Sequence, residues 1–156
     1  MTSADRFVVL PAYDPTYFAG VGTLTVDGAP TTVDLPDNRY TVLTFDGTRG
    51  QRLSIGLTGA ADPGNVYLEL ADPYGAAFAR DEHDSGRWGD GLYGAYDLPA
   101  LPITGTYSLV VFPVADNLGT ATITLSNKTV APLAIGGAGT AVTLDRAGQV
   151  AELTMS

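Results

Sequence analysis

The sequence predicts an all-β domain, an antiparallel β-sandwich of the jelly-roll kind, and three observations carry this prediction. Short runs of alternating apolar and polar residues recur along the chain, and a period of two is the period of a strand. Turn-forming residues separate these runs, with 19 Gly and 10 Pro spread among them. No window of a dozen residues keeps apolar side chains at helical spacing, so we expect no substantial helix.

Twelve short segments are the predicted strands, and turn residues such as Asp27-Gly28 and Asp46-Gly47 separate them. The segments are residues 7–10, 22–26, 31–35, 41–45, 51–57, 66–71, 95–98, 106–112, 120–125, 133–135, 141–144 and 150–155. Their intervening positions are mostly polar, which is typical of antiparallel sheets with one wet face. Two such sheets facing each other make a sandwich, and parallel α/β folds are disfavoured.

Alternation also predicts the core, because side chains two apart share one face of a strand. The predicted core residues are Leu43, Phe45, Leu53, Ile55, Leu57, Val66, Leu68, Leu70, Tyr107, Leu109, Val111, Ile123 and Leu125. At 156 residues the chain has the size of one domain. A domain of this size buries roughly two-thirds of its unfolded surface without help from metals or disulfides.

Composition excludes several classes of function. The formal net charge of -9 would repel a phosphate backbone over most of the surface, so we expect no nucleic-acid partner. The absence of Cys excludes disulfides, thiolate metal sites and thiol catalysis, and leaves the compartment open. The apolar run at residues 7–10 is too short for a signal peptide or a membrane span, so we expect neither in this chain.

The chain contains an internal repeat. Residues 24–35 align with residues 133–144, and after one inserted residue, residues 43–45 align with residues 153–155. The similarity predicts an N-terminal extension or docking arm (1–20), a β-sandwich repeat domain (21–130) and the start of a second repeat (131–156).

Two or three strands alone cannot bury an apolar face, so the C-terminal segment 131–156 must pack somewhere. Three interpretations stay open. The segment packs on its own domain, or it is donated as a strand pair to a neighbouring subunit, or it reflects where a longer repeat protein was cut.

Residues 43–57, 66–75 and 98–111 follow a known pattern, with Ile103-Thr-Gly-Thr-Tyr-Ser-Leu-Val-Val111 as its most specific element. The pattern resembles pre-peptidase C-terminal-like domains and related tandem repeats of large surface and secreted proteins of high-GC bacteria. The resemblance spans residues 21–126 and implies a β-sandwich jelly roll. It also implies an accessory role in targeting, adhesion, carbohydrate contact or spacing, with calcium bound in some members.

One acidic loop is the candidate metal site. Its hard oxygen ligands would come from Asp81, Glu82, Asp84 and Asp90, with glycines that let the chain wrap a Ca²⁺ ion. His83 and Ser85 stand where an EF-hand would place Asp or Asn, so the spacing is not that of an EF-hand. The alternative is a solvated acidic loop. Asp116 and Asn117 form a weaker second candidate.

Catalysis is not predicted, and no catalytic residues are assigned. His83, the only histidine, lies beside Asp84 and Ser85, but adjacent residues of one polar loop do not converge as a triad. Acidic residues are plentiful, yet nothing in the pattern sets two of them at the separation that glycoside hydrolysis needs.

Six aromatic residues are candidates for ligand or interface contacts. They are Trp88, Tyr93 and Tyr96 after the acidic loop, and Tyr13, Tyr17 and Phe18 in the N-terminal arm. Aromatic rings on loops stack on sugars or anchor protein interfaces, and ordinary core or rim packing is the alternative for the first three. For the arm we favour docking on its own domain or on a neighbour.

These observations favour a non-catalytic structural or assembly module of an extracellular, filamentous or virion-type assembly. Its partners would be proteins, through self-association or within a larger assembly, at the cell surface, outside the cell or on a virion. The alternative is a calcium-assisted carbohydrate-binding or adhesion accessory module that uses residues 81–96, with glycan as partner and Ca²⁺ as cofactor.

Overall fold

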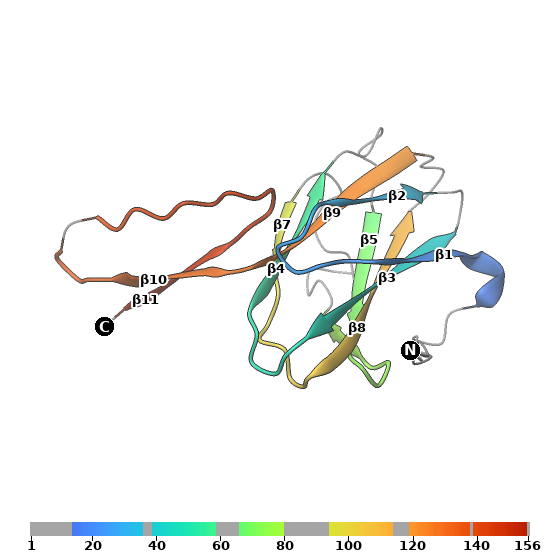
Figure 1. The fold of residues 1–156 in the computed structure, drawn as a ribbon, viewed down its shortest axis with the longest axis horizontal. Coiled ribbons are helices and arrows are strands. Elements are labelled where there is room, and N and C mark those ends of the chain that lie inside the picture. Colours follow the sequence, from blue (N-terminus) through green and yellow to red (C-terminus); the bar gives the residue numbers. More distant parts are fainter. Residues whose placement is uncertain are drawn as a thin grey trace, which may run out of the picture.

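The computed structural model describes residues 14–35, 39–58, 66–79, 94–113, 119–137 and 139–155. These residues form two sheets that face each other as a sandwich and a separate two-stranded sheet (Figure 1). The prediction of an all-β sandwich is confirmed, whereas the jelly-roll subtype stays a prediction. Among the described residues, no helix has the length and apolar character that crossing a bilayer requires.

The first sheet holds, in spatial order, β1 (Phe18–Thr23), β3 (Tyr40–Gly47), β8 (Gly105–Pro113), β5 (Val66–Ala71) and β6 (Ala77–Ala79). The second sheet holds β2 (Thr31–Leu35), β9 (Gly119–Asn127), β4 (Leu53–Thr58) and β7 (Gly94–Asp97). The third sheet consists of β10 (Thr129–Leu133) and β11 (Ala151–Met155). A short 3-10 turn, η1 (Pro15–Tyr17), precedes β1.

Asp14 caps η1. Its carboxylate accepts hydrogen bonds from the hydroxyl of Thr16 and, at 2.9 Å, from the backbone N–H of the same residue. These bonds hold the pKa of Asp14 below its ordinary value because they favour the ionised carboxylate. The bond from the Thr16 hydroxyl has the larger effect, and the bond from the Thr16 backbone has the smaller one.

The core lies between the first and second sheets, and every predicted core residue is buried. Tyr107 is fully buried in this core, and its ring stacks on Phe45 of the neighbouring strand, with centroids 5.4 Å apart. Its hydroxyl donates to the carbonyl of Ile103 at 2.7 Å. Burial raises the pKa of Tyr107, because a buried phenolate loses the solvation that water would give it.

Two strand pairs depart from the antiparallel prediction. The β1–β3 and β10–β11 pairs are parallel, whereas the other pairs in the described sheets are antiparallel. The β1–β3 pair is parallel because β2, which lies between them in sequence, belongs to the opposite sheet, so the chain returns to the first sheet in its original direction.

Several predicted boundaries also shift. Strand β1 begins at Phe18, so the limit of the arm at residue 20 falls inside a strand, and β10 begins at Thr129, ahead of residue 131. The strand predicted at residues 141–144 is absent, and β6 was not predicted. The strand predicted at residues 7–10 lies outside the described residues.

Candidate functional site at the C-terminal strand pair

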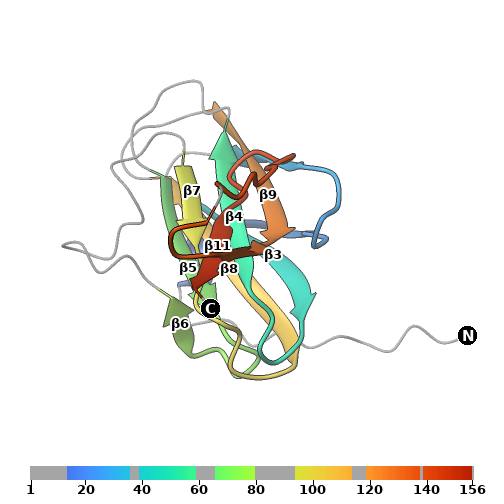
Figure 2. The same cartoon turned by 90° about the vertical axis from the view of Figure 1, so that its left-hand side faces the viewer.

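The C-terminal residues 129–155, here called the tail, extend away from the sandwich (Figure 1). Strand β10 leads away from the sandwich, the chain returns along residues 139–145, and β11 runs outward again, parallel to β10. Figure 2, which looks toward the end of the tail, shows it in front of β4 and β9 of the second sheet.

The tail repeats the β1–β3 pair in the same register. In the sandwich, Val21 pairs with Val42 and Gly22 pairs with Leu43. The alignment of the two sequence repeats carries these pairs onto Val130 with Glu152 and Ala131 with Leu153, and both pairs are present in the β10–β11 ladder. The internal sequence similarity is therefore a structural repeat that includes the strand register.

The turn after the first strand is repeated as well. The N–H of Gly28 donates to the carbonyl of Thr25 at 2.9 Å, and the N–H of Gly137 donates to the carbonyl of Ala134 at 3.3 Å. Both pairs occupy aligned positions, so the two copies turn in the same way.

A side-chain bond that follows this turn recurs too. The hydroxyl of Thr31 donates to the carbonyl of Thr23 at 3.2 Å, and the hydroxyl of Thr140 donates to the carbonyl of Pro132 at 3.0 Å. The tail thus reproduces the opening of the sandwich down to single hydrogen bonds.

The two copies differ in what covers them. The aligned pairs are Leu35–Leu144, Leu43–Leu153 and Phe45–Met155, with exposed fractions of 3, 0 and 3% in the sandwich and 49, 46 and 72% in the tail. In the sandwich, β8 pairs with β3, and β9 pairs with β2. No described strand takes either place in the tail, which explains why residues 140–144 form no strand there.

A tight turn attaches the tail to the outer face of the second sheet. The hydroxyl of Thr124 on β9 donates to the carbonyl of Ala147 at 2.6 Å. Gly148 has a φ of +69°, and a Cβ at this position would lie 2.1 Å from the Cα of Gly56 on β4. Only glycine fits both the left-handed backbone and this close approach.

Three hydrogen bonds from the Arg146 guanidinium, here called the Arg146 clasp, also attach the tail to the sandwich. The Nε of Arg146 donates to the Ser126 hydroxyl at 2.8 Å, and its Nη1 donates to the carbonyl of Asp27 at 3.1 Å. The second terminal nitrogen donates to the carbonyl of Gly28. One guanidinium therefore joins the tail to β9 and to the turn after β1, which its rigid fork of donors suits well.

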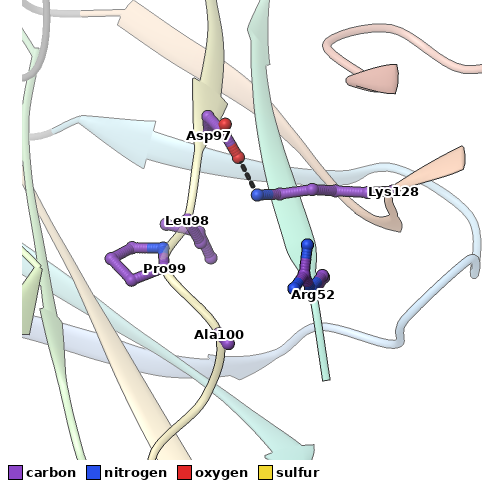
Figure 3. A pocket seen from close by; sticks show the side chains of 6 residues that line it. All are labelled: Arg52, Asp97, Leu98, Pro99, Ala100 and Lys128. Atoms are coloured by element: carbon purple, nitrogen blue, oxygen red, sulfur yellow. Dashed lines mark ion pairs between the residues drawn. The ribbon is translucent and has the colours of Figure 1, made fainter. Parts of the chain in front are cut away.

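A pocket of about 430 Å³ lies at the base of the tail (Figure 3). Its lining residues are Arg52, Asp97, Leu98, Pro99, Ala100 and Lys128. Lys128 forms an ion pair with Asp97, and Arg52 forms one with Glu152 of β11. Because both cations already have carboxylate partners, the pocket serves better as a junction between tail and sandwich than as an anion site.

The predicted calcium ligands Asp81, Glu82, Asp84 and Asp90 lie outside the described residues, as do Asp116 and Asn117, so both candidate sites stay predictions. Elsewhere, within the part of the chain that the structure describes, no group of three or more His, Cys, Asp or Glu side chains gathers as a metal site.

The structure describes three of the six aromatic candidates. Trp88, Tyr93 and Tyr13 lie outside the described residues. Tyr96 is half-buried against the core of the sandwich, and Tyr17 is exposed. The ring of Phe18 packs on buried Tyr40, with centroids 5.6 Å apart, on the outer face of the first sheet. A ligand or interface role for these residues stays a prediction.

Sequence reasoning missed the residues that attach the tail. Gly148 and Arg146 stand among turn-forming residues, which signals a turn. The sequence pattern does not show that this turn packs against Gly56, because a close approach between two glycines far apart in the sequence leaves no periodic signal.

Comparisons with known proteins give fold likenesses only. No family model matches the sequence, and no curated protein matches it. The pre-peptidase C-terminal domain of a Bacillus anthracis collagenase is 14% identical, with a TM-score of 0.45 over 67% of this chain and 93% of that one.

Two periplasmic inhibitors of g-type lysozyme are similar to the chain as well. The PliG of Aeromonas hydrophila is 20% identical with a TM-score of 0.42, and a PliG mutant from Escherichia coli is 21% identical with a TM-score of 0.40. Each alignment covers 69% of this chain and 99% of the inhibitor. The sandwich itself is established by the strand pairing above, and the family suggested by the sequence pattern stays a prediction.

Proposed function

We propose that the protein is a non-catalytic structural module that self-associates through its tail. The observation that carries this proposal is the exposure of Leu144, Leu153 and Met155, whose aligned counterparts in the sandwich are core residues. The tail presents core-type side chains without the layers that cover them in the sandwich. Exposed apolar surface of this kind is typical of an interaction site.

The energetics favour an assembled state. Full burial of one Leu or Met side chain stabilises a protein by about 1.5–3 kcal/mol, and a two-stranded sheet alone is marginally stable in water. A partner that covers Leu153 and Met155 therefore stabilises both the tail and the complex.

The sandwich acts as the platform that presents the tail. The Arg146 clasp and the contact between Gly148 and Gly56 attach the tail at one end, while its other end projects from the sandwich (Figure 1). An extracellular, cell-surface or particle-bound setting, predicted from the sequence, is part of this proposal. Its support is the resemblance to accessory modules of secreted and surface proteins.

Sedimentation velocity across a wide range of protein concentration tests the proposal. The full chain should gain mass as concentration rises, whereas the variant Leu153→Lys/Met155→Lys should stay monomeric. The matched control is Val21→Lys, which places a charge on an apolar residue of the sandwich that is 64% exposed. A wild-type monomer at every concentration, or association that survives the double substitution, would contradict the proposal.

A further inference from the structure

The two edges of the tail sheet differ. Each of its strands has one edge that no described strand pairs with. The N–H of Thr129 donates to the carbonyl of Val150 at 3.1 Å, so the backbone of Val150 faces β10. Backbone groups alternate in direction along a strand, and the N–H and C=O groups of Ala151, Leu153 and Met155 therefore point to the open edge.

The edge of β10 is closed to a further strand. The alternation that turns Thr129 toward β11 turns Pro132 away from it, and proline has no N–H to offer at that edge. The carbonyl of Pro132 already accepts the hydroxyl of Thr140.

The edge of β11 lacks the proline and lysine residues that often protect natural edges. The one charged residue of the strand, Glu152, forms an ion pair with Arg52 of the sandwich. Its outward backbone groups are available as a template for another strand.

The sandwich shows in which direction a strand pairs at the corresponding edge. Strand β3, the counterpart of β11, pairs at the corresponding edge with β8 in the antiparallel direction, and Leu43 stands opposite Leu109. A second copy related by a two-fold axis brings its own β11 to this edge in the same antiparallel direction. No strand of either copy has to leave its sandwich.

We propose that two copies of the chain pair through the open edges of β11, antiparallel and centred on Leu153. This inference rests on the proposed function and adds to it a contact between strand edges. Leu153 then stands opposite the partner's Leu153, and Ala151 stands opposite the partner's Met155. All outward backbone groups of β11 meet groups of the other copy, and the two tails form one four-stranded sheet.

The contact is small. Each β11 contributes five residues. A standard stable interface uses roughly 20–30 residues and buries roughly 800 Å² per partner. We therefore expect a weak dimer that forms as concentration rises.

Single cysteines test the pairing and its register, because the chain has no cysteine of its own. Residues directly opposite in a hydrogen-bonded antiparallel pair have Cα atoms about 5.5 Å apart, within the range that a disulfide spans. Under mild oxidation Leu153→Cys should form a covalent dimer. Met155→Cys is the matched control: its two copies would lie four residues apart along the strand, roughly 13 Å, and should stay unlinked.

The outcomes distinguish a failure of the pairing alone from a failure of the proposed function. Association that depends on the tail, without preferential linking of Leu153→Cys over Met155→Cys, overturns the pairing and leaves the proposed function standing. A chain that neither associates nor crosslinks overturns both.

Proline substitutions at the two edges give a second test. Leu153→Pro removes an N–H that points to the open edge and none that faces β10, so association should be lost while the tail keeps its own ladder. Val130→Pro is the control, because its N–H points to the edge of β10 that Pro132 closes. Equal effects of the two prolines on association would overturn the proposal.

Discussion

Leu153 stands in the tail where Leu43 stands in the sandwich, in the same register against the neighbouring strand, but Leu43 is fully buried and Leu153 is 46% exposed. The same truncation should therefore have different costs. Leu43→Ala should lower the free energy of unfolding by about 2–5 kcal/mol, because it opens a cavity in the core. Leu153→Ala should cost about 0.5 kcal/mol or less in the monomer. Urea unfolding at low protein concentration measures both, and equal costs would contradict the assignment of Leu153 to an uncovered copy of the core.

Gly148 is predicted to hold the tail against the sandwich. Gly148→Ala should release the turn, because the new Cβ would collide with Gly56 and the left-handed backbone adds strain of about 1–2 kcal/mol. Gly136→Ala is a matched control, since its φ of +73° imposes similar strain in open space. Hydrogen exchange should show faster exchange of the Thr129 amide in the first variant only. Similar rates in both variants would show that the close approach contributes nothing to docking.

Much of the fold follows from the sequence for a simple physical reason. Alternation reports which face of a strand is buried, and it correctly placed residues such as Leu43, Ile55 and Leu109 in the core. It says nothing about which strands are neighbours, so the parallel β1–β3 pair was not predicted. Strand β6, only three residues of Ala and Phe, is too short to show a period.

In the tail, the local alternation of apolar and polar residues is not enough to predict a strand. Residues 141–144 have the alternation of a strand and align with part of β2, but they form none, because β2 depends on pairing with β9 and no described strand does this in the tail. The docking of Gly148 on Gly56 depends on shape between distant segments. Composition and period carry no information about such a contact.

Arg146 should contribute to docking through the geometry of its guanidinium. Arg146→Lys keeps the charge but cannot reach Ser126, Asp27 and Gly28 together, so the tail should open more often, at a cost of about 1 kcal/mol. Arg39→Lys, at an exposed site of the sandwich, is the control. The measurement is the exchange rate of the Thr129 amide, which bonds the carbonyl of Val150. Unchanged exchange in Arg146→Lys would argue against the clasp.

Tyr107 should make the sandwich sensitive to alkali. Its folded-state pKa is raised by burial, so the unfolded chain loses this proton first, near the ordinary tyrosine pKa of about 10. The contribution of Tyr107 is therefore complete below that pH and is lost as the pH rises through the folded-state pKa. Tyr107→Phe should lower stability by about 1 kcal/mol at neutral pH, because Ile103 loses its hydroxyl partner. Its stability should also fall less steeply above pH 10, and a parallel fall in both proteins would contradict this role.

The most direct test of the central claim is amide exchange along β11, measured by NMR at low and high protein concentration. At low concentration the amides of Glu152 and Thr154, which face β10, should be protected, while those of Ala151, Leu153 and Met155 exchange freely. At high concentration these three should become protected as a second copy covers the open edge. If they exchange freely at every concentration, the open edge of β11 does not pair with a second copy and the proposed pairing is wrong.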